Sequence, residues 1–255
     1  MLNFATYGAE GAAPLMIVHG LFGSARNWGV IAKRLSDRGP VVTVDQRNHG
    51  HSQWVDSHTY PDMAADLAEV IEAQGGPMDV VGHSMGGKAV MVLALQRPDL
   101  IRRLIVADVA PVTYTHTQMQ YIDAMRGVDL AQVERRSDAE AQLKALGVEP
   151  SLCSFFTQSL DVKEKKWRLN LDILARDMDH IIGFPEVEGQ FDGPTVFLAG
   201  AESDYVTPEY RPEIKRLFPK AKVAKIPGAG HWLHAEKPRE FEAAVRAVLD
   251  APDAD

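Results

Sequence analysis

A serine stands between Val80 and Gly87 in a setting that suits a nucleophile. Residues 82–86 read Gly-His-Ser-Met-Gly, with an apolar run before them and a helical pattern after them. A sharp turn from strand to helix would strain Ser84 and project its hydroxyl above the sheet edge, and the small neighbours leave room for it. The following helix would point its N-terminal dipole and free N–H groups at developing negative charge. This segment therefore predicts acyl transfer by Ser84.

A serine hydroxyl needs a base, and nine histidines compete for that role. His231 lies in Gly-Ala-Gly-His-Trp, after the last predicted strand and before the last helix. That position is at the carboxyl edge of a parallel sheet, where Ser84 is also expected, so we predict His231 as the base. His19, by contrast, ends the first buried strand and is expected to be a structural hydrogen-bonding residue. His231 and His234 have zinc-like spacing, but without a third ligand cluster we expect no metal.

The base must be oriented by a carboxylate, for which the sequence offers two candidates. Asp108 ends the apolar run 104–107, and Asp204 follows the run 195–198. Both satisfy the chain order serine, acid, histidine. The sequence does not rank them, and either one would otherwise be a loop-capping aspartate. Asp45 is a third acid at the sheet edge, but it lies earlier in the chain and is expected to anchor its own loop.

Two backbone N–H groups are expected to form an oxyanion hole. One belongs to Met85, directly after the nucleophile. The other is expected from the loop His-Gly-Leu-Phe-Gly at residues 19–23, from the N–H of Leu21. The glycines of this loop allow its backbone to approach a substrate closely. The side chains of Phe22 and Met85 would then line an apolar acyl pocket.

A second motif overlaps the serine turn. Gly82 through Gly87-Lys88 matches a phosphate-binding loop except at its last position, where Ala89 replaces the hydroxyl residue that would bind Mg²⁺. We therefore favour the serine turn over nucleotide binding. Lys88 is then expected to be a helix residue that faces solvent or the sheet edge.

Strands and helices alternate along most of the chain. This order predicts an α/β fold with a doubly wound, mostly parallel sheet. The strands are expected at 15–18, 41–44, 78–81, 104–107, 195–198 and 222–226. The helices between them are expected at 24–37, 61–74, 84–96, 208–218 and 238–249.

The alternation stops after Pro111. Between residues 112 and 190 only helical patterns are found, at 116–125, 137–146, 151–160 and 170–181. We interpret this segment as an all-helical cap, or lid, inserted into a core made of residues 1–111 and 191–255. Four of its residues are candidates for substrate binding, although packing inside the cap is the favoured explanation for any single one of them. They are Tyr114, Met119, Phe155 and Trp167.

The composition excludes several other classes of protein. The single cysteine, Cys153, excludes an internal disulfide and a multi-cysteine zinc site. A net charge of −8 argues against nucleic acid or an anionic membrane as partner. No apolar run approaches the ~20 residues of a membrane span, and no basic residue precedes Arg26, so a cytoplasmic protein without a signal peptide is expected. We expect a small-molecule ester as partner and no cofactor.

The chain resembles the serine α/β-hydrolases. The resemblance spans nearly the whole sequence and is weaker in the cap. Its strongest elements are the loop 19–23, Arg-Asn-His-Gly-His-Ser at 47–52, Gly-His-Ser-Met-Gly-Gly-Lys at 82–88 and the segment 228–234. Together with Asp-Val-Ala-Pro-Val-Thr-Tyr at 108–114, these are similar to the bacterial YbfF-type esterases and their eukaryotic relatives.

This resemblance implies a serine carboxylesterase that hydrolyses small to medium carboxylic esters, and acyl thioesters as a further class, through an acyl-enzyme formed by Ser84 with His231. It implies Asp108 as the acid that orients His231. Asp204, however, stands at the position where the superfamily more usually has this acid, so both aspartates remain candidates. Other serine-based activities stay open, namely carbon–carbon hydrolase, lactonase and perhydrolase. A non-catalytic ligand receptor on the same scaffold is the alternative from a different class.

Overall fold

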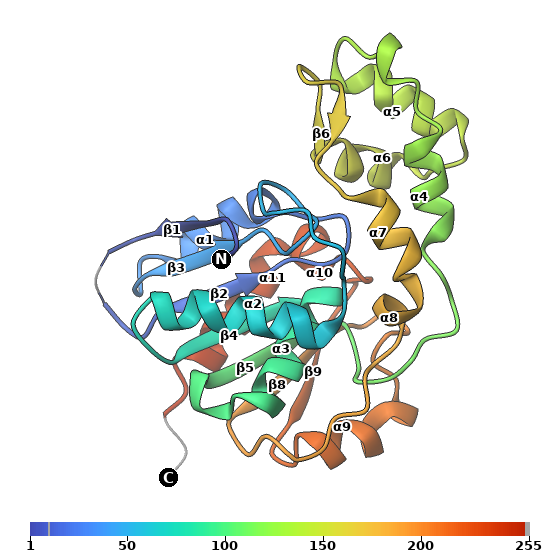
Figure 1. Ribbon diagram of the computed structural model, residues 1–255. Coiled ribbons are helices and arrows are strands. Elements are labelled where there is room, and N and C mark those ends of the chain that lie inside the picture. Colours follow the sequence, from blue (N-terminus) through green and yellow to red (C-terminus); the bar gives the residue numbers. More distant parts are fainter. Residues whose placement is uncertain (10, 253–255) are drawn as a thin grey trace.

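The computed structural model describes residues 1–9 and 11–252, and a seven-stranded sheet forms its centre (Figure 1). The strand order is β1-β3-β2-β4-β5-β8-β9, and every neighbouring pair is parallel except β1 with β3. The strands are β1 Phe4–Tyr7, β2 Leu15–Val18, β3 Val41–Val44, β4 Met78–His83, β5 Ile101–Ala107, β8 Thr195–Gly200 and β9 Lys222–Ile226. The predicted fold class is confirmed, and of the seven strands of this sheet the sequence missed the edge strand β1.

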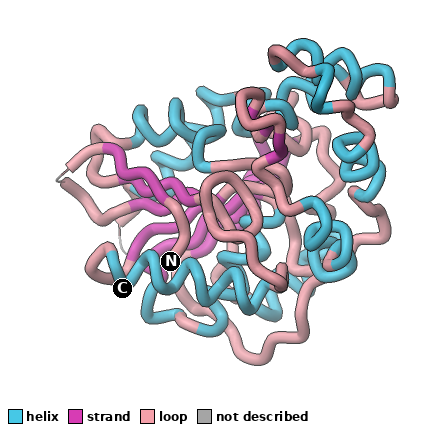
Figure 2. Tube along the Cα trace, turned by 45° about the horizontal axis from the view of Figure 1, so that its top comes forward, coloured by secondary structure: helices cyan, strands magenta, loops and turns pink. Residues whose placement is uncertain are grey.

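The sheet carries helices on both faces, as Figure 2 shows by the magenta strands between cyan layers. Strand β2 is buried throughout, and its residues alternate between two apolar cores, with Met16 and Val18 in one and Leu15 and Ile17 in the other. The first core includes buried residues of α2 (Tyr60–Ala73), α3 (Met85–Gln96) and α9 (Arg211–Leu217). The second includes those of α1 (Gly29–Leu35) and α11 (Pro238–Leu249). Burial on both faces explains why these strands lack polar alternation.

The segment between β5 and β8 is mostly helical, and most of it stands above the sheet at the upper right of Figure 1. Its helices are α4 Met119–Arg126, α5 Arg136–Ala145, α6 Pro150–Thr157, α7 Leu171–Arg176 and α8 Met178–Ile182. It also contains a short antiparallel hairpin, β6 Leu160–Asp161 with β7 Lys166–Trp167, so the expectation of an all-helical segment was wrong. Two paired residues on each strand give no periodic pattern that sequence reading could detect.

Short helices complete the chain at the loops. They are η1 Ala25–Trp28, η2 Pro98–Leu100, η3 Leu130–Gln132, η4 Pro208–Tyr210 and α10 Leu233–Glu236. No helix within residues 1–9 and 11–252 is long and apolar enough to cross a membrane. The parallel strands all end at one edge of the sheet, and the loops that leave this edge carry the site described next.

Candidate active site

Ser84 stands at the turn between β4 and α3 with φ 53° and ψ −120°, a backbone conformation that non-glycine residues rarely adopt. The two glycines beside it are required by close contacts. A Cβ on Gly82 would lie 2.5 Å from the carbonyl oxygen of Gly86. A Cβ on Gly86 would lie 2.4 Å from that of His19. The sequence Gly-His-Ser-Met-Gly therefore folds as the predicted sharp turn, with Ser84 at its tip.

Ser84, His231 and Asp108 form one hydrogen-bonded chain. The Oγ atom of Ser84 lies 3.0 Å from Nε2 of His231. The opposite ring nitrogen, Nδ1 of His231, lies 2.8 Å from Oδ2 of Asp108. An imidazole in this arrangement carries its proton on Nδ1 and leaves Nε2 free to accept the serine proton.

The carboxylate of Asp108 is fully buried and accepts two further hydrogen bonds. Oδ1 accepts from the backbone N–H of Gly200 at 2.9 Å, and Oδ2 accepts from the hydroxyl of Ser203 at 2.5 Å. The sequence left Asp108 and Asp204 as alternatives, and the structure places Asp108 on His231, whereas Asp204 is exposed to solvent. Ser203, which the sequence analysis missed, directly precedes Asp204 in this loop.

Two aromatic rings hold His231 in place. The ring of Tyr205 stacks on it with 3.9 Å between centroids and 20° between planes. His83 lies beside it and donates from Nε2 to the carbonyl oxygen of His231 at 2.9 Å. Burial and the neighbouring histidines hold the pKa of His83 well below its ordinary value, so this ring is neutral. Tyr114 ties the surrounding loops together, because its hydroxyl accepts from the N–H of Ala110 and donates to the carbonyl oxygen of Tyr205.

The loop 19–23 lies directly against Ser84. A Cβ on Gly20 would lie 3.2 Å from the Cβ of Ser84, so the backbone approaches as the sequence predicted. Met85 is the first residue of α3, and its N–H has no partner within the helix. Leu21 and Met85 both line the cavity beside Ser84. Their N–H groups are thus the candidate donors to an oxyanion.

A cavity of about 220 Å³ opens above Ser84, between the sheet edge and the segment 112–190. Three of the residues predicted to bind substrate, Phe22, Tyr114 and Phe155, line it. The structure places the other two elsewhere. Met119 is not among the lining residues, and Trp167 borders a separate hollow and donates from Nε1 to the carbonyl oxygen of Met125. Cavity residues that the sequence did not single out include Tyr60, Tyr121, Phe156, Ile181 and Tyr205.

The position of Lys88 differs from the sequence prediction. Its side chain is buried, whereas we expected it to face solvent or the sheet edge. Its ammonium group donates to the carbonyl oxygens of Val112 at 2.8 Å, Ile182 at 2.8 Å and Gly183 at 2.6 Å. It also lies 4.6 Å from the centroid of the Tyr114 ring. Three acceptors use all three ammonium protons, which leaves none to bind a phosphate as the overlapping motif would require.

Lys88 therefore binds two stretches of backbone at once, one at residue 112 and one at residues 182–183, near the two ends of the segment 112–190. Burial lowers the pKa of Lys88 to about 7. No group of three His, Cys, Asp or Glu side chains that could hold a metal ion occurs within the described residues.

The fold and the hydrogen-bonded serine, histidine and aspartate define the class as α/β hydrolase. Residues 15–244 match the family described as the Alpha/beta hydrolase family, and the chain belongs to it.

The relatives of the chain include named esterases and lipases. It is 41% identical over 260 residues to the mouse (Mus musculus) protein named sn-1-specific diacylglycerol lipase ABHD11, covering 97% of this chain and 85% of that protein. It is 37% identical over 240 residues to Esterase YbfF of Escherichia coli strain K12, covering 93% of each. A solved structure titled Marine microorganism esterase superposes with a TM-score of 0.92 at 38% identity, over 97% of this chain and 98% of that one. The comparisons support a hydrolase that acts on ester bonds.

Proposed function

We propose that this protein is a serine carboxylesterase that hydrolyses small to medium carboxylic esters through an acyl-enzyme on Ser84. The observation that carries the proposal is the Ser84–His231–Asp108 chain at the floor of an apolar cavity, with distances of 3.0 and 2.8 Å. The strained turn at Ser84 adds support, because such strain is typical of functional sites. Acyl thioesters have the same reacting carbonyl and are proposed as a further substrate class.

In the acylation step, Oγ of Ser84 attacks the carbonyl carbon while Nε2 of His231 takes its proton. The carbonyl electron pair moves to oxygen, and the N–H groups of Leu21 and Met85 receive the resulting oxyanion. Asp108 stabilises the imidazolium that forms. The tetrahedral intermediate then collapses, the bond to the leaving oxygen breaks, and His231 returns its proton to the departing alcohol.

Deacylation repeats these steps with water. His231 removes a proton from water, the hydroxide oxygen attacks the acyl carbon, and the same two N–H groups receive the oxyanion. Collapse releases the carboxylic acid and returns the proton to Ser84. The triad and the oxyanion hole thus serve both halves of the reaction.

We further propose that residues 112–190 act as a cap over a core of residues 1–111 and 191–255. Phe155 and Phe156 of α6, together with Tyr121 of α4, reach the cavity from this segment. A cavity of about 220 Å³ is smaller than the ~300–1,000 Å³ of typical drug-sized sites, which favours short and medium acyl groups. Phe22 lies edge-on to Phe156 across the cavity wall, which gives the acyl group an apolar surface.

A panel of p-nitrophenyl esters of increasing acyl length tests this function. We expect turnover with short and medium chains, and loss of that turnover in Ser84→Ala. Ser137→Ala, which changes an exposed serine of α5, is the matched control and should keep full activity. Absence of ester turnover across all chain lengths would contradict the proposal. Turnover of lactones, peracid precursors or carbon–carbon substrates in place of esters would support the other serine-based activities instead.

A further inference from the structure

The loop that presents the Leu21 N–H is a strained tight turn. The N–H of Gly23 donates to the carbonyl oxygen of Gly20 at 3.0 Å, which closes a four-residue turn. Its third residue, Phe22, has φ 64°, a conformation that usually requires glycine. A phenylalanine remains there only if its surroundings hold it. The groups that hold Phe22 also set the direction of the Leu21 N–H, because that direction depends on this turn.

The imidazole ring of His49 supports this turn through a hydrogen bond. The backbone N–H of Phe22 donates to Nε2 of His49 at 3.2 Å. The other ring nitrogen, Nδ1, donates to the carbonyl oxygen of Arg47 at 2.9 Å. Only a neutral ring with its proton on Nδ1 can make both contacts, since a protonated ring has no acceptor. Burial, with smaller contributions from His19 and His58, holds the pKa of His49 well below its ordinary value and keeps this ring neutral.

A second buried histidine holds the preceding peptide. Nδ1 of His19 donates to the carbonyl oxygen of Gly20 at 2.7 Å, and Nε2 accepts from the N–H of Gln46 at 3.0 Å. The Gly20 carbonyl and the Leu21 N–H belong to one planar trans peptide and point in opposite directions. Fixing the first therefore aims the second. The two histidine rings thus fix the peptide before Leu21 and the peptide after it.

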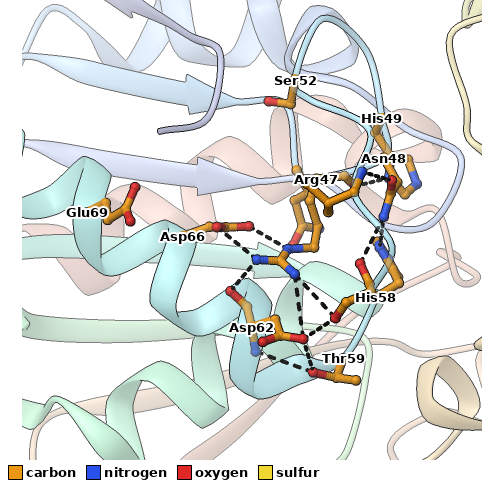
Figure 3. Close-up of polar contacts among 12 residues, drawn as sticks. Arg47, Asn48, His49, Ser52, His58, Thr59, Asp62, Asp66 and Glu69 are labelled. Atoms are coloured by element: carbon orange, nitrogen blue, oxygen red, sulfur yellow. Dashed lines mark hydrogen bonds and ion pairs between the residues drawn. The ribbon is translucent and has the colours of Figure 1, made fainter.

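The loop that carries His49 is itself firmly anchored, as Figure 3 shows. Arg47 forms a bidentate pair with Asp66 of α2, at 2.6 and 3.0 Å. Asn48 accepts at its side-chain oxygen from Val55 N–H and donates to the carbonyl oxygen of Ser57. These contacts hold the loop that carries the His49 ring. The ring itself lies outside the cavity, because His49 is not among the residues that line it.

We propose that His49 is a positioning residue of the oxyanion hole. Its neutral ring accepts a hydrogen bond from the Phe22 N–H and so stabilises the left-handed backbone conformation of Phe22. This conformation keeps the Leu21 N–H directed at the oxyanion. On the other side, the hydroxyl of Ser159 donates to the carbonyl oxygen of Phe22 at 3.0 Å, so both polar groups of Phe22 are fixed. The inference rests on the proposed esterase function of the same site.

Removing the acceptor tests the role. His49→Phe keeps a planar ring but cannot accept the Phe22 N–H, whereas His49→Gln can supply a side-chain oxygen near the position of Nε2. We expect kcat of His49→Phe to fall about 10–100-fold with KM little changed, because an oxyanion interaction is made in the transition state. Inhibition by an alkyl trifluoromethyl ketone, which forms an oxyanion adduct on serine, should weaken by a similar factor. His49→Gln should regain most of both losses.

His51→Phe provides the matched control, since it makes the same substitution two residues away in the same loop, at a side chain that is exposed to solvent. It should keep the wild-type kcat. A folded His49→Phe with wild-type kcat would overturn the inference, as would equal losses of kcat in His49→Phe and His51→Phe. Either result leaves the esterase proposal standing if wild-type protein turns over esters and Ser84→Ala does not.

A spectroscopic measurement on the wild-type protein covers the case in which His49→Phe does not fold. In ¹⁵N-labelled protein, with the signals assigned by their loss in His49→Gln, His49 should show a protonated Nδ1 and an unprotonated Nε2 between about pH 5 and 8. A proton on Nε2, or titration of His49 within that range, would overturn the inference.

Discussion

Nδ1 of His231 and Oδ2 of Asp108 lie 2.8 Å apart, although 123 residues separate them in the chain. The contact forms because β5, which ends before Asp108, pairs in parallel with β8 and β8 pairs with β9, which leads to His231. The whole segment 112–190 is inserted between β5 and β8 without separating those two strands. The sheet therefore sets the geometry of the site, and residues of the inserted segment line the cavity beside it.

The two acids should differ sharply in a rate assay. Asp108→Asn should lower kcat by about 10³–10⁴-fold, since an asparagine does not hold His231 in the required tautomer or stabilise its positive charge. Asp204→Asn should leave kcat unchanged because its carboxylate is exposed to solvent. Steady-state kinetics on one p-nitrophenyl ester measures both. A large loss in Asp204→Asn with none in Asp108→Asn would show that a different acid serves His231.

Ser203 should have a smaller effect through the same carboxylate. Ser203→Ala removes one hydrogen bond to a buried charged group, an interaction worth ~1.5–3 kcal/mol when complete. We expect kcat to fall about tenfold, which corresponds to ~1.4 kcal/mol, because the N–H of Gly200 and His231 still hold Asp108. Ser203→Thr retains the hydroxyl and should restore most of the rate. Equal losses in the alanine and threonine variants would show that the hydroxyl is not the relevant group.

Lys88 should give the folded protein a distinct pH dependence. Burial lowers its pKa to about 7 in the folded chain, against ~10.4 in an unfolded one. Between these values the unfolded chain binds more protons, so the contribution of Lys88 to the free energy of unfolding rises with pH, by up to about 1.4 kcal/mol per unit. Below the folded pKa this gain is absent, because both states are protonated. Urea denaturation at several pH values measures the slope.

Lys88→Met is the comparison for that measurement. It should lack the rise between about pH 7 and 10, because methionine does not titrate. It should also be less stable overall, since the carbonyl oxygens of Val112, Ile182 and Gly183 lose their buried donor. Identical pH slopes in the two proteins would rule out the titration of Lys88 as the source of the effect.

Gly86 should not tolerate a side chain. Gly86→Ala would bring a Cβ to within 2.4 Å of the His19 carbonyl oxygen and 2.5 Å of that of Val18, so the backbone must shift. We expect a loss of ~1–3 kcal/mol in the free energy of unfolding, the usual cost of overpacking. Gly29→Ala is the control, because Gly29 has helical φ and the nearest atom to its Cβ would be 3.3 Å away. Equal stability of the two variants would contradict the close approach.

The sequence predicted the buried part of the fold well. The parallel strands β2 and β3 occur at the predicted residues because β-branched, apolar runs bounded by turns are a strong local signal. Strand β9 also occurs at its predicted residues, although most of it is exposed. Strand β1 was missed because an edge strand of four residues, half-exposed, carries no such run. The hairpin β6–β7 was missed for a similar reason, since each of its strands has only two residues.

The site was predictable where a residue type and its place in the strand order were sufficient, as for Ser84 and His231. Chain order alone did not choose between Asp108 and Asp204, since both follow strands at one sheet edge. Lys88 was misplaced because helix periodicity reports only on its own helix. The carbonyl groups that bury it come from residues 112 and 182–183, which are distant in sequence.

The proposed mechanism requires Ser84 to carry a covalent acyl group during turnover. Rapid mixing of the protein with a p-nitrophenyl ester, followed by acid quench, peptide digestion and mass spectrometry, tests it directly. We predict a burst of p-nitrophenolate stoichiometric with enzyme and an acyl adduct on the peptide that contains Ser84, with both absent in Ser84→Ala. Turnover that persists in Ser84→Ala, or an adduct on a different residue, would contradict the account.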